Sequence, residues 1–275
     1  MTNNDIIKSV SDDQQIIISD ILSLHNNGDG FDVDITYSTG NFYGYKMVGR
    51  DIVIIPQPKH KFDVAPMDNT VTKIEPWGDI PMEDGAVHSV MFDPPFIISP
   101  RNAPSVLSED DNNKIFRRFS GYYPVNELLD SYHHWLKESY RILEDGGICV
   151  VKCQPTVTGG KELNSHMFVW FIAECLGFDV IDEFILIADN RLIGKMENQE
   201  HARKYHSYFF VLKKKCSKKV PYLNYLTDDE IADIMSNFVA NNVGKNNGDK
   251  KYRDDCVPQL DSMNRNDGFV EVALF

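Results

Sequence analysis

The hydrophobic and polar residues of this chain recur with two periods, and each period predicts a different kind of element. Apolar residues recur every three or four positions at 14–26, 125–143 and 165–176, which predicts three amphipathic helices. Short, mostly apolar runs predict strands at 31–36, 51–56, 71–74, 86–92, 148–153, 178–188 and 207–212. The runs at 51–56 and 148–153 are typical of strands buried on both faces. Strands that alternate with helices indicate an α/β fold with a mostly parallel sheet and helices on both faces.

The pattern weakens towards the C-terminus, and we expect the domain to end near residue 215. Residues 1–215 are predicted to form the α/β domain and residues 216–275 a C-terminal helix, linker and tail. Thr227 and Glu230 form a capping box, which predicts a short helix to about residue 240. Inside the domain, residues 97–123 form a segment long enough to be a lid over a site, with disorder as the alternative.

Composition and charge narrow the class of protein. No apolar run approaches the roughly 20 residues that span a bilayer, and the N-terminus lacks a secretory signal, so we expect a cytoplasmic protein without membrane contact. The five cysteines are scattered, which disfavours a disulfide framework and a zinc site, and we expect no metal.

The net charge of −13 argues against indiscriminate binding of nucleic acid, because phosphate contacts need lysine and arginine. The segment 189–220 nevertheless holds nine basic and three acidic residues, Lys213, Lys214 and Lys215 among them. This local excess predicts either a basic patch for DNA or a solvated face.

One motif carries chemistry. The tetrad Asp93-Pro94-Pro95-Phe96 follows the apolar run 86–92, which places it at the carboxyl end of a strand, where open α/β sheets bind ligands. A rigid turn after a strand is the purely structural alternative. The functional interpretation is methyl transfer to an aromatic amine, a poor nucleophile because its lone pair is delocalised into the ring.

Each residue type in the tetrad has a part in that chemistry. The Asp93 carboxylate and a backbone carbonyl of the Pro94–Pro95 turn would accept the two amino hydrogens, so that the lone pair of the nitrogen points at the methyl donor. The two prolines fix the backbone that aims this carbonyl. Phe96 offers a flat face on which an extruded base stacks.

With this motif the chain resembles the class I S-adenosylmethionine-dependent methyltransferases, and among them the DNA amino-methyltransferases that carry [Asp/Asn/Ser]-Pro-Pro-[aromatic]. The resemblance implies a Rossmann-like fold with a mostly parallel seven-stranded sheet, S-adenosylmethionine as cofactor and DNA as partner. It implies transfer to a flipped base, with Asp93, Pro94, Pro95 and Phe96 as the catalytic residues. Asp at position 93 favours N6 of adenine, because cytosine-N4 enzymes usually have Ser and glutamine enzymes Asn.

The resemblance also assigns residues that bind the cofactor. The loop Asp34-Ile35-Thr36-Tyr37-Ser38-Thr39-Gly40 is similar to the family's Asp-Pro-Phe-x-Gly-x-Gly, with Ser38 in place of the middle glycine. Asp63 is the expected ligand of the ribose hydroxyls, with Asp51 as the alternative. The implied cofactor-binding residues are Asp34, Thr36, Ser38, Gly40, Asp63, Trp77 and Asp79, where Asp79 contacts the adenine amine and Trp77 stacks on the ring.

A second likeness is to phage and bacterial methylases with "R-[FY]-G-x-Y", "K-C-Q" and "H-S-[YF]" segments. Here these are Arg118-Phe119-Ser120-Gly121-Tyr122, Lys152-Cys153-Gln154 and His206-Ser207-Tyr208. The likeness implies a bacterial or phage-encoded enzyme in which Arg117, Arg118 and Lys152 contact the substrate. A large target-recognition domain is missing, so recognition must fall to loops, to residues 97–123, or to a protein partner or second copy.

Three other functions fit the same residues. Adenine or cytosine in RNA, and a glutamine amide in protein, are planar amines that the same chemistry can methylate. A non-catalytic methyltransferase-like subunit that binds a partner is an alternative of a different class, which the altered cofactor loop keeps open.

Overall fold

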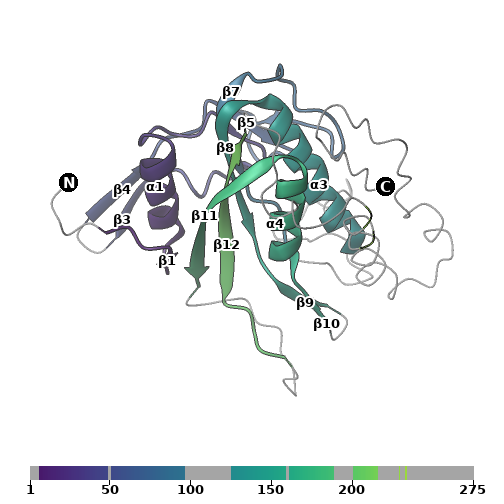
Figure 1. Ribbon diagram of the computed structural model, residues 1–275. Coiled ribbons are helices and arrows are strands. Elements are labelled where there is room, and N and C mark those ends of the chain that lie inside the picture. The colour runs from purple at the N-terminus through teal and green to yellow at the C-terminus, as the bar shows by residue number, and fades with distance from the viewer. Residues whose placement is uncertain are drawn as a thin grey trace.

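The computed structural model describes residues 6–48, 51–96, 125–158, 161–188 and 201–215, together with Asp229 and Asp233 (Figure 1). Its main feature is an eight-stranded sheet with the strand order β1-β11-β12-β8-β7-β2-β5-β6. These strands are β1 (Val10–Ser11), β2 (Val33–Asp34), β5 (His60–Asp63), β6 (Thr72–Lys73), β7 (Val87–Phe92), β8 (Leu143–Cys153), β11 (Phe178–Ile187) and β12 (His206–Lys214).

The sheet is mostly parallel, as predicted. Five neighbouring pairs are parallel, and only β12 runs antiparallel to its two neighbours, β11 and β8. The predicted Rossmann-like α/β class is therefore confirmed. The expected count of seven strands is wrong by one, because the short strand β1 adds to the edge beside β11.

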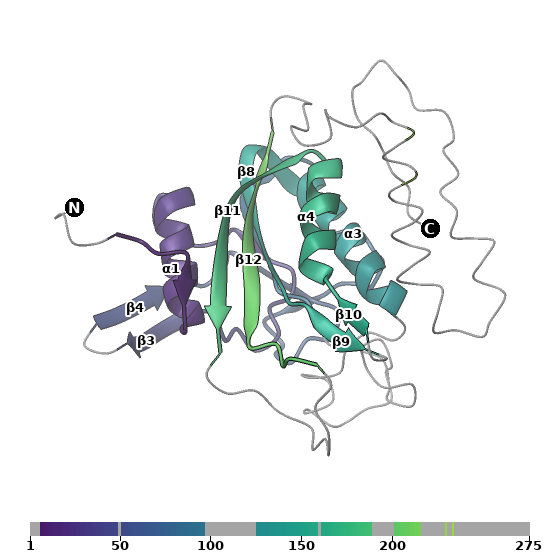
Figure 2. The same ribbon diagram turned by 60° about the horizontal axis from the view of Figure 1, so that its bottom comes forward.

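Helices cover both faces of the sheet (Figure 2). Helices α3 (Val125–Ile142) and α4 (Ser165–Cys175) lie on one face, and α1 (Gln14–His25) lies on the other. Each layer has its own apolar core, the larger one around Tyr132, Phe92 and Phe178 and the smaller one around Ile17 and Phe209. These helices match the three predicted by the 3.6-residue period, and each ends within one residue of the predicted position.

The predicted strand 51–56 exists, but its place in the fold is a correction. It forms β4 (Asp51–Ile55), which pairs only with β3 (Gly44–Val48) in an antiparallel hairpin outside the main sheet. One face of this hairpin rests on α1 and buries Ile55, whereas Ile52 and Ile54 are 58% and 68% exposed. The strand next to β2 is instead β5, whose sequence His-Lys-Phe-Asp has one buried apolar residue, Phe62.

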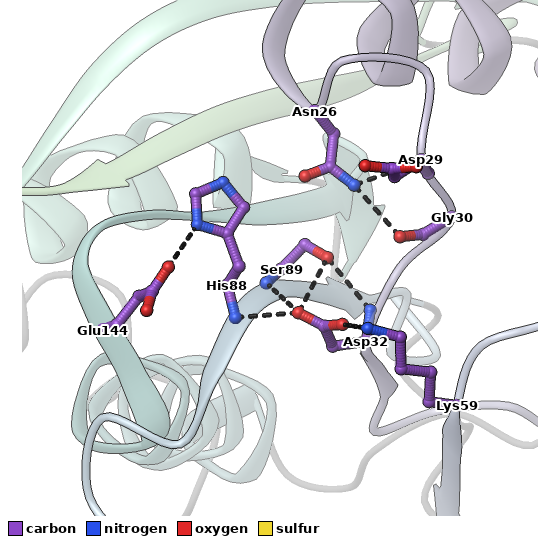
Figure 3. Close-up of polar contacts among 8 residues, drawn as sticks. All are labelled: Asn26, Asp29, Gly30, Asp32, Lys59, His88, Ser89 and Glu144. Carbon is purple, nitrogen blue, oxygen red and sulfur yellow. Dashed lines mark hydrogen bonds and ion pairs between the residues drawn. The ribbon is translucent and has the colours of Figure 1, made fainter.

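A polar network joins strands at the amino edge of the sheet (Figure 3). The Asp32 carboxylate accepts hydrogen bonds from the backbone N–H groups of His88 (2.8 Å) and Ser89 (3.1 Å) and pairs with Lys59 at 2.5 Å. His88 also contacts Glu144 of β8 at 2.7 Å. These contacts tie the starts of β2, β5 and β7 together.

A second small hairpin, which the sequence does not predict, follows β8 and consists of β9 (Thr156–Thr158) and β10 (Lys161–Leu163). The segment 97–123 and nearly all of 216–275 lie outside the described residues, so the predicted lid and linker stay predictions; Asp229 and Asp233 are helical and exposed. In the described part of the chain, no helix is both long and apolar enough to cross a membrane.

Candidate active site

Four neighbouring strands end at one edge of the sheet, and each brings a charged side chain there. Asp34 closes β2, Asp63 closes β5, Asp93 follows β7 directly, and Lys152 is the last residue but one of β8. The four strands stand side by side in the order β8-β7-β2-β5. This is the carboxyl edge, where parallel α/β sheets place their ligands.

Asp34 is the most deeply buried of these carboxylates, at 1% exposure. Its Oδ1 accepts a hydrogen bond from the backbone N–H of Thr36 (2.8 Å), and its Oδ2 accepts one from the hydroxyl of Tyr43 (2.5 Å). Burial raises the pKa of Asp34 to about 7, and the neighbouring charges of Asp93 and Asp63 add to this rise, which outweighs the lowering by the two hydrogen bonds. Asp34 is therefore a carboxylate that a nearby cation would stabilise.

The loop after Asp34 turns sharply through two residues with left-handed backbone, Ser38 at φ 51° and Gly40 at φ 68°. The left-handed backbone at Gly40 would strain any side chain, and a Cβ there would also displace the ring of Tyr37, so glycine is favoured at this position. The backbone N–H of Ser38 donates to Oδ2 of Asp63 at 2.8 Å. That bond ties the loop after β2 to the end of β5.

Asp63 also accepts the backbone N–H of Ala65 at 2.7 Å, so both of its oxygens hold loop backbone in place. Burial raises the pKa of Asp63, and the two N–H donors lower it in part. A carboxylate oxygen accepts more than one hydrogen bond, so these contacts leave capacity for a ligand hydroxyl.

Asp93 is anchored through its backbone and its side chain. Its N–H donates to Oγ1 of Thr36 (2.7 Å), and its Oδ2 lies 3.4 Å from Nζ of Lys152. Burial raises the pKa of Asp93, while the charge of Lys152 and its hydrogen bond lower it. The Thr36 hydroxyl thus joins the loop after β2 to the motif after β7.

Phe96 is half-buried, with its ring centroid 5.9 Å from Nζ of Lys152. The same ammonium lies 5.1 Å from the ring centroid of Phe42 and 5.4 Å from that of Phe209. The end of β7 is therefore lined on one side by aromatic rings grouped around one cation.

The chemistry of this edge fits S-adenosylmethionine. Its amino acid end carries an ammonium and its sulfur a positive charge, whereas the site presents the clustered carboxylates of Asp34, Asp63 and Asp93. The backbone at Ser38 and Gly40 has the sharp turn that lets a ligand approach the main chain closely. The residues present thus match the charge of such a donor.

The structure brings together most of the predicted site residues but not all. Trp77 is 46% exposed and packs edge-on against His134 of α3, and Asp79 is exposed in the same loop. No contact described for either reaches the three clustered carboxylates. Arg117 and Arg118 lie outside the described residues, as does the side chain of Asp51, which begins β4 in the hairpin.

Several neighbours of the site residues have no signal in the local sequence. Tyr43 donates to Asp34 from nine residues away, and no local pattern marks it. Phe209 faces Lys152 because the two are paired in the register of β12 and β8. The contact of Phe209 depends on the pairing of two strands distant in the chain, which a single sequence does not reveal.

Comparisons with known proteins agree with the geometry. The family model described as DNA methylase matches residues 87–263. No curated protein sequence matches the chain.

Three solved structures are similar to parts of this chain. A candidate DNA modification methylase of Thermus thermophilus, complexed with S-adenosylmethionine, is 16% identical, covering 59% of this chain and 70% of that one, with a TM-score of 0.32. The cytosine-N4-specific PvuII DNA methyltransferase is 16% identical over 49% of this chain and 45% of that one, with a TM-score of 0.34. An S-adenosylmethionine-dependent methyltransferase of Methanosarcina mazei is 8% identical over 72% and 98%, with a TM-score of 0.37.

The family match extends over more than half of the chain and includes both the Asp93–Phe96 motif and the strand that ends in Lys152 and Cys153. The motif lies where the sheet order requires it, at the end of β7 and beside the loop after β2. The chain therefore belongs to the DNA methylase family, the S-adenosylmethionine-dependent methyltransferases of exocyclic N6 and N4 amino groups.

Proposed function

We propose that this protein methylates N6 of adenine in DNA, on a base flipped out of the helix. The observation that carries the proposal is the Asp93 carboxylate, held at the end of β7 beside a cation and the Phe96 ring. Serine is the usual residue of cytosine-N4 enzymes in this position. An aspartate therefore favours adenine.

Asp93 acts as the acceptor for one amino hydrogen of the target, and a backbone carbonyl of the Pro94–Pro95 turn accepts the other. The nitrogen lone pair is then directed away from the ring and towards the donor. The bond from Asp93 N–H to Thr36 Oγ1 (2.7 Å) keeps this acceptor in register with the donor loop. Phe96 supplies the face on which the flipped base stacks.

S-adenosylmethionine, when bound, supplies an electrophilic methyl group, so no covalent intermediate with the protein is needed. Asp34 would hold its positively charged amino acid end, and Asp63 would accept hydrogen bonds from its ribose hydroxyls. Thr36, Ser38 and Gly40 would supply the backbone turn against which it lies. Asp79 would contact its adenine amine, and Trp77 would stack on the adenine ring.

Arg117, Arg118 and Lys152 were predicted to contact the substrate. The two arginines keep this role in the proposal, because DNA phosphates need cations and residues 97–123 adjoin the motif in the chain. Lys152 is buried with its ammonium directed at Asp93, which favours an indirect role.

The test is product analysis. The protein is incubated with isotopically labelled donor and adenine-containing duplex DNA, and the DNA is digested to nucleosides for mass spectrometry. We expect labelled N6-methyldeoxyadenosine. Label found instead in N4-methyldeoxycytidine, in an RNA pool or in a protein pool would show that the substrate is cytosine, RNA or protein and not adenine in DNA.

Asp93→Ala is the matched variant. Removing a preorganised group of this kind costs roughly 10²–10³ in rate, and donor affinity should change little because Asp93 is assigned to the target amine. Phe96→Ala should instead weaken binding of the flipped base by about 1–3 kcal/mol and keep turnover at high DNA concentration. Single-turnover rates near wild type in Asp93→Ala would reduce the motif to a rigid turn.

A further inference from the structure

Lys152 is a buried cation surrounded mainly by aromatic rings. Three aromatic rings lie around its ammonium, those of Phe42, Phe96 and Phe209, at 5.1–5.9 Å. Two oxygens approach Nζ, Oδ2 of Asp93 at 3.4 Å and Oε1 of Gln14 at 3.3 Å.

Stability does not account for this arrangement. Removing an ammonium and a carboxylate from water costs several kcal/mol each, and apolar replacements of buried ion pairs are often neutral or stabilising. The neighbours of Lys152 on its face of β8 include Val150, which belongs to the apolar core beneath α1.

The sheet itself holds the pair in register. Phe92 of β7 is paired with Val151 of the parallel strand β8, so the next residues, Asp93 and Lys152, lie side by side. Lys152 is also paired with Phe209 of β12, which leaves its backbone no freedom to move away. Asp93 is fixed in turn by its N–H bond to Thr36.

We propose that Lys152 is a positioning residue, which holds the Asp93 carboxylate ionised and oriented for the target amine. The inference rests on the proposed function, in which an ionised Asp93 accepts an amino hydrogen. Lys152 occupies Oδ2 and, within the described residues, leaves Oδ1 available to the amine. The rings screen the pair from water and stabilise the ammonium through their faces.

The other groups that act on Asp93 have the opposite effect or none. Asp34 at the end of β2 is a second carboxylate, and because the repulsion by which Asp93 raises the pKa of Asp34 is mutual, Asp34 does not favour the ionised form of Asp93. Tyr43 and Cys153 are protonated near neutral pH, because burial raises the pKa of each well above its usual value. Lys152 is thus the cation that offsets the burial of Asp93 in the described part of the chain.

The direct test is the titration of Asp93 by ¹³C NMR in protein labelled at aspartate carboxyl carbons, with Asp93→Asn to assign the signal. In Lys152→Met the titration midpoint of Asp93 should rise by about one to three pH units, the usual effect of losing an adjacent opposite charge. Lys152→Arg should restore it. Lys214→Met is the matched control, because Lys214 also lies over a ring, that of Tyr140 at 4.7 Å, but at the other end of the sheet.

A kinetic arm follows the same variants. Single-turnover methyl transfer by Lys152→Met should be lost most at low pH and recover as pH rises, with donor affinity within about twofold of wild type. An unchanged Asp93 midpoint in Lys152→Met would overturn the inference, whatever the activity. A raised midpoint in a protein that methylates no nucleic acid would support the inference on Lys152 and refute the proposed function. If Lys152→Met does not fold, Lys152→Gln gives the same readout.

Discussion

At the scale of single residues, ionisation of the Asp34 carboxyl is unfavourable in the folded protein. It is buried, it lies near two other carboxylates, and its pKa is raised to about 7, so near neutral pH it is only partly ionised. A positively charged ligand end beside it would favour the ionised form. Donor binding would therefore release a proton from Asp34 below about pH 7.

We expect donor affinity to rise with pH and to level off above about pH 7. Each pH unit below that value should weaken binding by up to about tenfold, because Asp34 must lose its proton first. Asp34→Asn should bind the donor weakly at all pH values and without this dependence, since asparagine has no carboxyl proton to lose. Calorimetry with S-adenosylhomocysteine in buffers of different ionisation enthalpy measures both affinity and proton release.

The control for this experiment is Asp32→Asn, the same chemical change two residues earlier and at the amino edge of the sheet. It should leave the pH dependence of donor affinity as in wild type. A pH-independent affinity in wild-type protein would show that Asp34 does not face a cationic part of the donor.

At the scale of elements, the Asp32 carboxylate connects neighbouring strands at the amino edge of the sheet. A single carboxylate accepts the N–H groups that begin β7 and pairs with the lysine that precedes β5 (Figure 3). These contacts lower the pKa of Asp32, although partial burial opposes them as the largest single effect. The carboxylate therefore stabilises the folded state when it is ionised.

Asp32→Ala should lower the free energy of unfolding by about 1–3 kcal/mol at pH 7, because two backbone donors lose their acceptor. A carboxyl whose pKa is lowered in the fold contributes stability above its unfolded pKa and loses it as pH falls through the folded pKa. The difference between wild type and variant should therefore narrow below about pH 4. Urea unfolding across this pH range provides the measurement, and a constant difference would contradict the role of the charge.

The elements themselves differ in how far the sequence determined them. The helices α1, α3 and α4 and the strand β7 were predicted closely, because each carries its own apolar period. The strand β4 was placed in the wrong sheet because an isoleucine-rich run suits a buried strand and a hairpin equally. The strand β5, which brings Asp63 to the site, has four residues and only one buried apolar residue, so its local sequence barely predicts a strand.

The residues of the candidate site also differ in how well the local sequence predicts them. Asp34, Asp63 and Asp93 were identified because each follows a predicted strand or belongs to a motif. Of the partners that set their charge and orientation, Tyr43 lies nine residues from Asp34 and Lys152 lies 59 residues from Asp93. Those contacts depend on strand pairing and loop closure, which have no signature in local composition.

At the scale of the whole molecule, the lysine cluster at 213–215 and the three clustered aspartates lie at opposite edges of the sheet. Lys213, Lys214 and Lys215 were expected to form either a DNA-binding patch or a solvated face. They lie at the end of β12 that is paired with the start of β8, away from Asp93. Lys214 donates to the carbonyl of Leu143 (2.7 Å), and Lys215 pairs with Asp179 and Glu174.

The structure therefore favours a stabilising role for this cluster. Replacing the three lysines with glutamine should lower the free energy of unfolding and leave DNA affinity close to wild type. The plot of log affinity against log salt concentration gives the number of phosphate contacts, and its slope should not change. A slope flatter by about 0.9 for each lysine would show that these lysines contact DNA phosphates.

The order in which the active-site strands stand in the sheet has a consequence for how the protein acquires activity. The first 96 residues contain all three clustered aspartates, but β7 pairs on one side with β8, which ends at Cys153. Contacts between such distant segments close large loops and form slowly compared with local helices. During synthesis on the ribosome, the three aspartates are therefore made before the strand that carries Lys152. That strand, β8, in turn pairs with β12, which ends at Lys214. We therefore expect methyl transfer only from chains that include β12.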